Sequence, residues 1–127
     1  MIQRLFLLAS WAMLAFIAFA TLSPLEERPA VASQHLEHFA AFALLGFMLV
    51  RGYPTRTVLS VAIVIASAFA LEALQLLTPD RHGRLLDALV KAAGGIFGIG
   101  VGRLAVPLLW QQINRIRHCL GLGPRAS

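Results

Sequence analysis

The sequence predicts an all-α fold, a polytopic membrane bundle of four helices. Hydrophobic residues make up 58% of the 127-residue chain and charged residues only 13%, about half the charged share of a soluble domain. The hydrophobic residues are grouped in four segments, each close to the roughly 20 residues that a helix needs to cross a bilayer. We therefore expect a single membrane domain over residues 1–127, with spans near residues 5–22, 31–50, 57–77 and 85–110 and a basic tail at 111–127.

The first segment has two readings. Arg4, an apolar run and the small residues around Ala18 and Ala20 follow the order of a cleavable signal peptide. The apolar run nevertheless continues to Leu22, which makes it long enough to span. We expect this segment to remain as the first transmembrane helix, with cleavage as the alternative.

The second segment is the least apolar. Its continuous apolar part, residues 39–50, is too short to cross a bilayer at about 1.5 Å per residue. A span must therefore begin near Pro29, a residue suited to the first turn of a helix, and end before Pro54. Its first turns then include Gln34, His35, Glu37 and His38. A short interfacial or re-entrant segment is the alternative.

The fourth segment combines polar and small residues on one face. Asp87 and Lys91 are four residues apart, and the same face continues with Gly94, Gly98 and Gly102. Small residues at this spacing are typical of helix–helix contacts in membranes. We therefore expect these glycines to pack helices together and Asp87 to face the bundle rather than lipid.

Basic residues predict the orientation. With four spans, the amino terminus, the second loop and the tail share one side of the membrane, and this side has most of the arginines. An excess of Lys and Arg is typical of the cytoplasmic side, so we expect both termini in the cytoplasm. These arginines are Arg4, Arg51, Arg56, Arg115, Arg117 and Arg125.

The net charge of +5 does not indicate nucleic-acid binding, because the charge lies in short loops and the tail. Cys119 is the only cysteine, which excludes an intrachain disulfide.

A carboxylate inside an apolar span is the main indication of a site. Glu72 lies one helical turn before Gln75 near the end of the third segment, and a charged residue at a helix centre costs about 2.5–3.5 kcal/mol on insertion scales. Glu72 should therefore face protein or water, paired with Arg81, Lys91 or protonated His38. The predicted topology gathers the candidate pocket residues near the outer leaflet: His38, Glu72, Gln75, Arg81, Asp87 and Lys91.

Two interpretations of these polar residues stay open. Hydrogen bonds that join helices account best for Gln75, and Asp87 with Lys91 is as well explained by a helical ion pair. A ligand site is favoured for Glu72 together with Arg81. His35 and His38 have an i, i+3 spacing that a metal could use with carboxylates, but the signal is weak. We expect no metal and no cofactor, and the sequence identifies no catalytic residue.

The order of these motifs resembles the VanZ-like family, small four-helix bacterial membrane proteins named for a glycopeptide-resistance accessory protein. The resemblance covers residues 21–102 and rests on His38-Phe39, Glu72-x-x-Gln75, Pro79-x-Arg81 and Asp87 followed by Gly94. The positions that carry over are His38, Glu72, Gln75, Arg81 and Asp87.

The chain departs from the family pattern at several positions. Gln34 and His35 stand where the family usually has Asp-Lys, Phe42 where it has tyrosine, and Lys91 where it has asparagine. His35 therefore matches no family position. Lys91 changes the charge beside Asp87, so the family's ligand cannot simply be assumed for this chain.

The resemblance implies a role at the bacterial inner membrane in lipid-linked glycan or cell-surface polymer metabolism, related to antibiotic resistance. We expect a non-enzymatic accessory that binds an anionic lipid or lipid-linked glycan headgroup, with Arg81 on phosphate and carboxylates on sugar or amine groups. One alternative is an enzyme acting on such a lipid with His38 and either Glu72 or Asp87. The other is a scaffold subunit whose glycine face docks a membrane protein partner or a second copy of the chain.

Overall fold

A computed structural model describes residues 1–23, 33–77 and 85–121 of the chain. All regular elements in these ranges are helical, as the sequence predicts. They are α1 (Ile2–Leu22), α2 (Gln34–Gly52), α3 (Thr57–Leu76), α4 (Leu85–Gly100), the π-helical segment η2 (Val101–Ala105) and α5 (Val106–Cys119).

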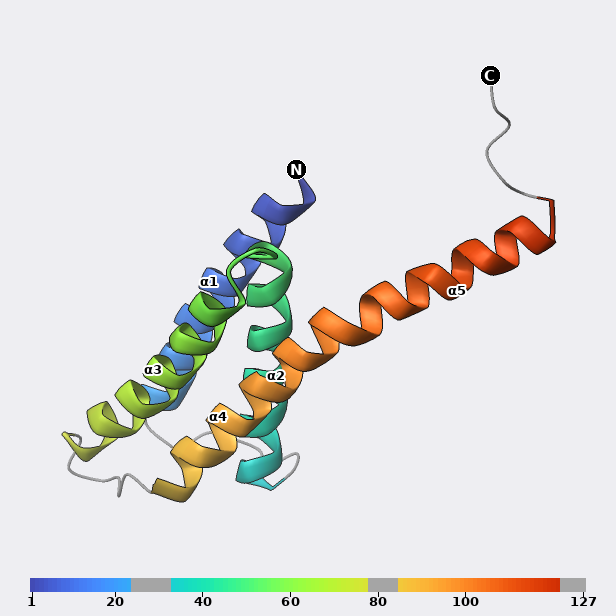
Figure 1. The fold of residues 1–127 in the computed structure, drawn as a ribbon. Coiled ribbons are helices and arrows are strands. Elements are labelled where there is room, and N and C mark those ends of the chain that lie inside the picture. Colours follow the sequence, from blue (N-terminus) through green and yellow to red (C-terminus); the bar gives the residue numbers. More distant parts are fainter. Residues whose placement is uncertain (24–32, 78–84, 122–127) are drawn as a thin grey trace.

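The first four helices form an up-and-down bundle with α2 at its centre (Figure 1). The most extensive contact is between α2 and α4, and α2 also packs against α1 and α3. The third helix, α3, lies against α4 on its other side. As a result, α4 lies between α2 and α3 and can present side chains to both.

Helix length and composition make this a multi-pass membrane protein. The segments Ile2–Leu22, Thr57–Leu76 and Leu85–Cys119 are long and apolar enough to cross a membrane. Large apolar side chains remain exposed along these helices, as lipid contact requires. Examples are Leu8, Phe16, Phe19, Val58, Phe97 and Leu104.

The central helix α2 does not reach the same apolarity, and its position explains why. It is one continuous helix of 19 residues, about 28 Å long, but it is not among the described helices that are long and apolar enough to cross a membrane. Its apolar side chains Phe42, Leu45 and Leu49 are buried among the other helices. Its polar first turn, residues 34–37, is exposed at the end of the bundle, whereas the later apolar part of the helix is packed among its neighbours. The described helix begins at Gln34, and the predicted start near residues 29–31 lies outside the described residues.

The first helix contributes to the same core. Ile17 belongs to the buried apolar cluster, and Ser10 is fully buried with its hydroxyl donating to the carbonyl oxygen of Leu7 at 2.8 Å. A bundle without this helix would expose the surfaces of α2 and α3 against which α1 packs. These contacts favour α1 as a permanent span.

Glycines allow α2 and α4 to meet at backbone distance. A Cβ atom at Gly94 would overlap the carbonyl oxygen of Phe39, and one at Gly98 would overlap that of Ala43. At Gly102 an added Cβ would come within 2.6 Å of a Val50 methyl group. The glycine face therefore packs helices, as its spacing indicates, and α2 of the same chain covers it. It is not available as the docking face of the scaffold alternative.

The helix that contains the fourth predicted span continues beyond that span. We expected it to end near residue 110, but helix continues through η2 and α5 to Cys119 and projects beyond the bundle (Figure 1). Pro107 lies at the start of α5, directly after the π-helical turn. A proline ring clashes with the carbonyl four residues earlier in a regular helix. The wider π-helical turn relieves this clash, so proline does not end the helix.

Gly98→Ala should destabilise the bundle, because the new methyl group must push the backbone of α2 away from α4. We expect a loss of about 1–3 kcal/mol, as for other overpacked contacts, measured by unfolding of the purified protein in mixed micelles. Gly100→Ala is the matched control, since a Cβ at Gly100 meets no atom within 4 Å. It should be neutral or stabilising by up to about 1 kcal/mol from helix propensity. Equal losses in both variants would contradict the close α2–α4 contact.

Candidate functional site

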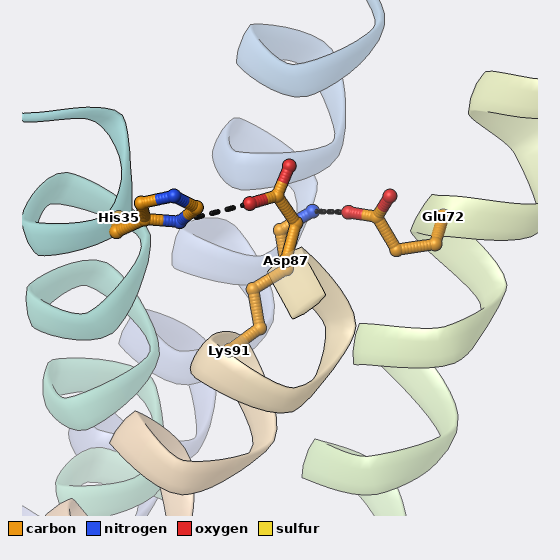
Figure 2. A network of polar contacts seen from close by, with 4 residues as sticks. All are labelled: His35, Glu72, Asp87 and Lys91. Carbon is orange, nitrogen blue, oxygen red and sulfur yellow. Dashed lines mark hydrogen bonds and ion pairs between the residues drawn. The ribbon is translucent and has the colours of Figure 1, made fainter. Parts of the chain in front are cut away.

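An ion pair between α3 and α4 forms the base of the candidate site (Figure 2). The Lys91 ammonium on α4 donates to the Glu72 carboxylate on α3. The side chain of Lys91 is 0% exposed and that of Glu72 is 9% exposed. Of the three partners expected for Glu72, namely Arg81, Lys91 and His38, the described structure pairs it with Lys91.

Burial makes this pair obligatory. An unpaired charge in the interior costs several kcal/mol, whereas a close pair recovers most of that cost. Lys91 lies one turn after Asp87 on the bundle face of α4, and Glu72 faces the bundle from α3. The pair thus fixes the rotation of both helices.

A second contact joins α4 to α2. His35 Nδ1 lies 2.9 Å from Asp87 Oδ1. By distance it is an ion pair when His35 is protonated, although its geometry is not that of a well-aligned hydrogen bond. The Asp87 side chain is 9% exposed but that of His35 is 47% exposed, so solvent or a ligand reaches this contact from the His35 side.

The two contacts make one cluster across three helices (Figure 2). Lys91 extends past Asp87 toward Glu72, and His35 approaches Asp87 from the opposite side. The charges are −1 for each carboxylate and +1 for Lys91, so the four residues sum to −1 with His35 neutral and to zero with His35 protonated. The cluster is rich in hydrogen-bond acceptors.

Two further predicted residues lie on the same elements. Gln75 is buried on α3, one turn after Glu72. His38 is half-buried on α2, one turn after His35, and its Nδ1 atom is buried without a hydrogen-bond partner among the described residues. A buried ring nitrogen of this kind normally binds a water molecule or a ligand.

The structure brings some of the sequence-predicted residues together and leaves others outside the described ranges. It brings Glu72, Lys91 and Asp87 together, but the helical Asp87–Lys91 pair gives way to two contacts between helices. Arg81 lies outside the described residues. Sequence reasoning did not select His35 for the pocket, because it matches no family position. Its i, i+3 spacing to His38, and hence its place on the same helical face, was the available signal.

Metal binding gains no support from this geometry. Within the described ranges, no group of three or more His, Cys, Asp or Glu side chains is placed to hold a metal ion. The carboxylates are engaged with Lys91 and His35. The described cluster is suited to polar and ionic contacts with an organic group.

Lys91→Met should leave the Glu72 carboxylate buried without its cation and destabilise the protein by about 3–5 kcal/mol. The double variant Glu72→Gln with Lys91→Met should lose less than Lys91→Met alone, because no uncompensated charge remains. Unfolding in mixed micelles gives both values in a double-mutant cycle. Arg115→Met removes an equal charge from the exposed helix α5 and should change stability by less than about 0.5 kcal/mol. Additive losses for Glu72 and Lys91 would contradict the pair.

Comparison with known proteins agrees with the motifs. A family model described as VanZ/LLP1 matches residues 3–106, and this range includes His35, Glu72, Asp87 and Lys91. Searches of curated proteins and of solved structures found no match. The match covers most of the chain and the whole bundle, so the protein belongs to the VanZ/LLP1 family.

Proposed function

We propose that this membrane protein binds the polar headgroup of an anionic lipid or a lipid-linked glycan of the cell envelope. The observation that supports this most is the contact between Asp87, a nearly buried carboxylate, and the half-exposed His35. A headgroup that approaches Asp87 from the exposed His35 side must replace or join His35. Such a group, charged and open on one side, is typical of ligand sites near the end of a membrane bundle.

The chemistry of the cluster favours particular parts of a headgroup. Asp87 can accept hydrogen bonds from sugar hydroxyls or an amine, and the unpartnered Nδ1 of His38 adds a polar atom on the adjacent helix. The Glu72–Lys91 pair is neutral and buried, so its role in this proposal is to hold α3 against α4. A phosphate on the same lipid would need a cation, and Arg81 is the residue that the family pattern supplies for it.

Binding without catalysis fits the described contacts better than acid–base chemistry. The enzyme alternative requires His38 to act with Glu72 or Asp87. Among the described residues, those carboxylates contact Lys91 and His35 instead of His38. We therefore retain the accessory, non-enzymatic role as the proposal.

Asp87→Asn should remove the carboxylate at the mouth of the cluster while keeping its size. We expect the protein, purified in mild detergent and incubated with a bacterial envelope lipid extract, to retain fewer glycosylated or amine-bearing lipids by at least about tenfold. Native mass spectrometry identifies the retained lipids.

Gln112→Ala, a change on the exposed face of α5, is the matched control and should retain the same lipids as the unchanged protein. If both variants and the unchanged protein retain identical lipids, the proposed headgroup site is wrong. A variant at His35, His35→Ala, should widen access to Asp87 and alter which lipids are retained.

The proposed orientation places both termini in the cytoplasm and the cluster toward the outer leaflet. Cys119 is exposed and is the only cysteine of the chain, so a membrane-impermeant maleimide should label it only after cells are permeabilised. In a Cys119→Ser background, Ser33→Cys should be labelled in intact cells, because Ser33 is exposed at the opposite end of the bundle. The reverse labelling pattern would overturn the orientation.

A further inference from the structure

A groove lies at the end of the bundle opposite the ion-pair cluster. It has a volume of about 470 Å³ and is formed by the α2–α3 connection, the first turn of α3 and the π-helical segment η2. Thr57 of the groove and Glu72 of the cluster are fifteen residues apart on α3, or roughly 22 Å. The groove is therefore a separate feature. Its lining residues are Thr55, Arg56, Thr57, Val58, Leu59 and Arg103.

The groove contains two cations without acidic partners. Neither Arg56 nor Arg103 forms an ion pair with an acidic side chain among the described residues. Arg103 Nη1 donates to the carbonyl oxygen of Pro54 at 2.6 Å, which holds its guanidinium against the α2–α3 connection. A guanidinium has five N–H donors, so most of them remain for a ligand.

The start of α3 adds favourable electrostatics. Arg56 is the N-cap residue, no side chain caps the helix, and its first turn has no acidic residue. The first amides of a helix have no acceptor within the helix, and its dipole favours an anion there. An anionic oxygen at this place would meet donors from the first turn of the backbone and from both arginines.

The apolar residues that line the groove, Val58 and Leu59, indicate an amphiphilic ligand. Val58 is 83% exposed and Leu59 is 37% exposed, and both lie in the first turn of the apolar helix α3, after Arg56 and Thr57. A ligand in this groove therefore meets cations at one end and a lipid-facing apolar surface at the other. We propose that the groove binds the phosphate of an anionic phospholipid from the adjacent leaflet, with Arg56 and Arg103 on the phosphate and the acyl chains along Val58 and Leu59.

Lipid binding could also come from the general attraction of basic residues to an anionic membrane. Arg115 is exposed on α5 and does not line the groove, so a variant at this residue measures that general attraction. The distinguishing experiment measures binding of fluorescent phosphatidylglycerol to the full-length protein in detergent micelles. Arg56→Gln and Arg103→Gln should each weaken binding by roughly tenfold or more, since each removes a charge-assisted contact. Arg115→Gln, with the same change of charge, should weaken it by less than about twofold.

Competition separates the sources of phosphate. Unlabelled phosphatidylglycerol should displace the probe, whereas inorganic phosphate at the same concentration should not, because it lacks the acyl chains that contact Val58 and Leu59. If the three arginine variants weaken binding equally, the groove is not the binding site. If inorganic phosphate displaces the probe, the ligand is not specifically a phospholipid. Arg56→Gln keeps the test valid if loss of the Arg103–Pro54 hydrogen bond disturbs folding, because Arg56 makes no side-chain hydrogen bond or ion pair with another described residue.

Discussion

The backbone contact between α2 and α4 is the constraint on which the rest of the structure depends. Gly94 and Gly98 leave no room for a side chain against the carbonyl groups of α2, so α4 lies as close to α2 as two helices can. This depth of packing brings Asp87 within reach of His35 on α2 and directs Lys91 to Glu72 on α3. If α4 stood farther from α2, neither charge on α4 would have its partner, and burial of both would be prohibitive.

The two ends of the bundle have opposite characters as a result. The described acidic residues lie at one end of the bundle: Glu37 in the first turn of α2, Glu72 near the end of α3 and Asp87 in the first turn of α4. Six arginines lie at the other end of the described chain or along α5, without an acidic residue nearby. One end therefore offers a polar cluster in which opposite charges are already paired, and the other offers free cations. Hydroxyl and amine groups suit the acceptors of the first end, and an anionic group suits the cations of the second.

Helix positions could be predicted from the sequence because each apolar segment is near the length of a span, and Glu72 required a cation that only a few residues could supply. The His35–Asp87 contact could not be predicted in this way. It depends on the rotation of α2 about its axis, which the short apolar stretch of that helix leaves undetermined. The helix also continues to Cys119, past the predicted end of the span at residue 110, because the polar residues after Trp110 end the apolar run without ending the helix. Arg81 remains a prediction from the family motif.

The uninterrupted helix from Leu85 to Cys119 is longer than the hydrocarbon core of a bilayer is thick. Its 35 residues extend about 52 Å, whereas the hydrocarbon core is about 30 Å thick. The whole helix would fit within the hydrocarbon core only at a tilt of roughly 55° from the bilayer normal, which is beyond the range of about 0–40° seen for spanning helices. Its last turns must therefore stand in the headgroup layer and the water beyond. Arg115 and Arg117 are carried on a rigid rod at a fixed distance from the bundle, and any rocking of α4 between its neighbours is magnified at that distal tip.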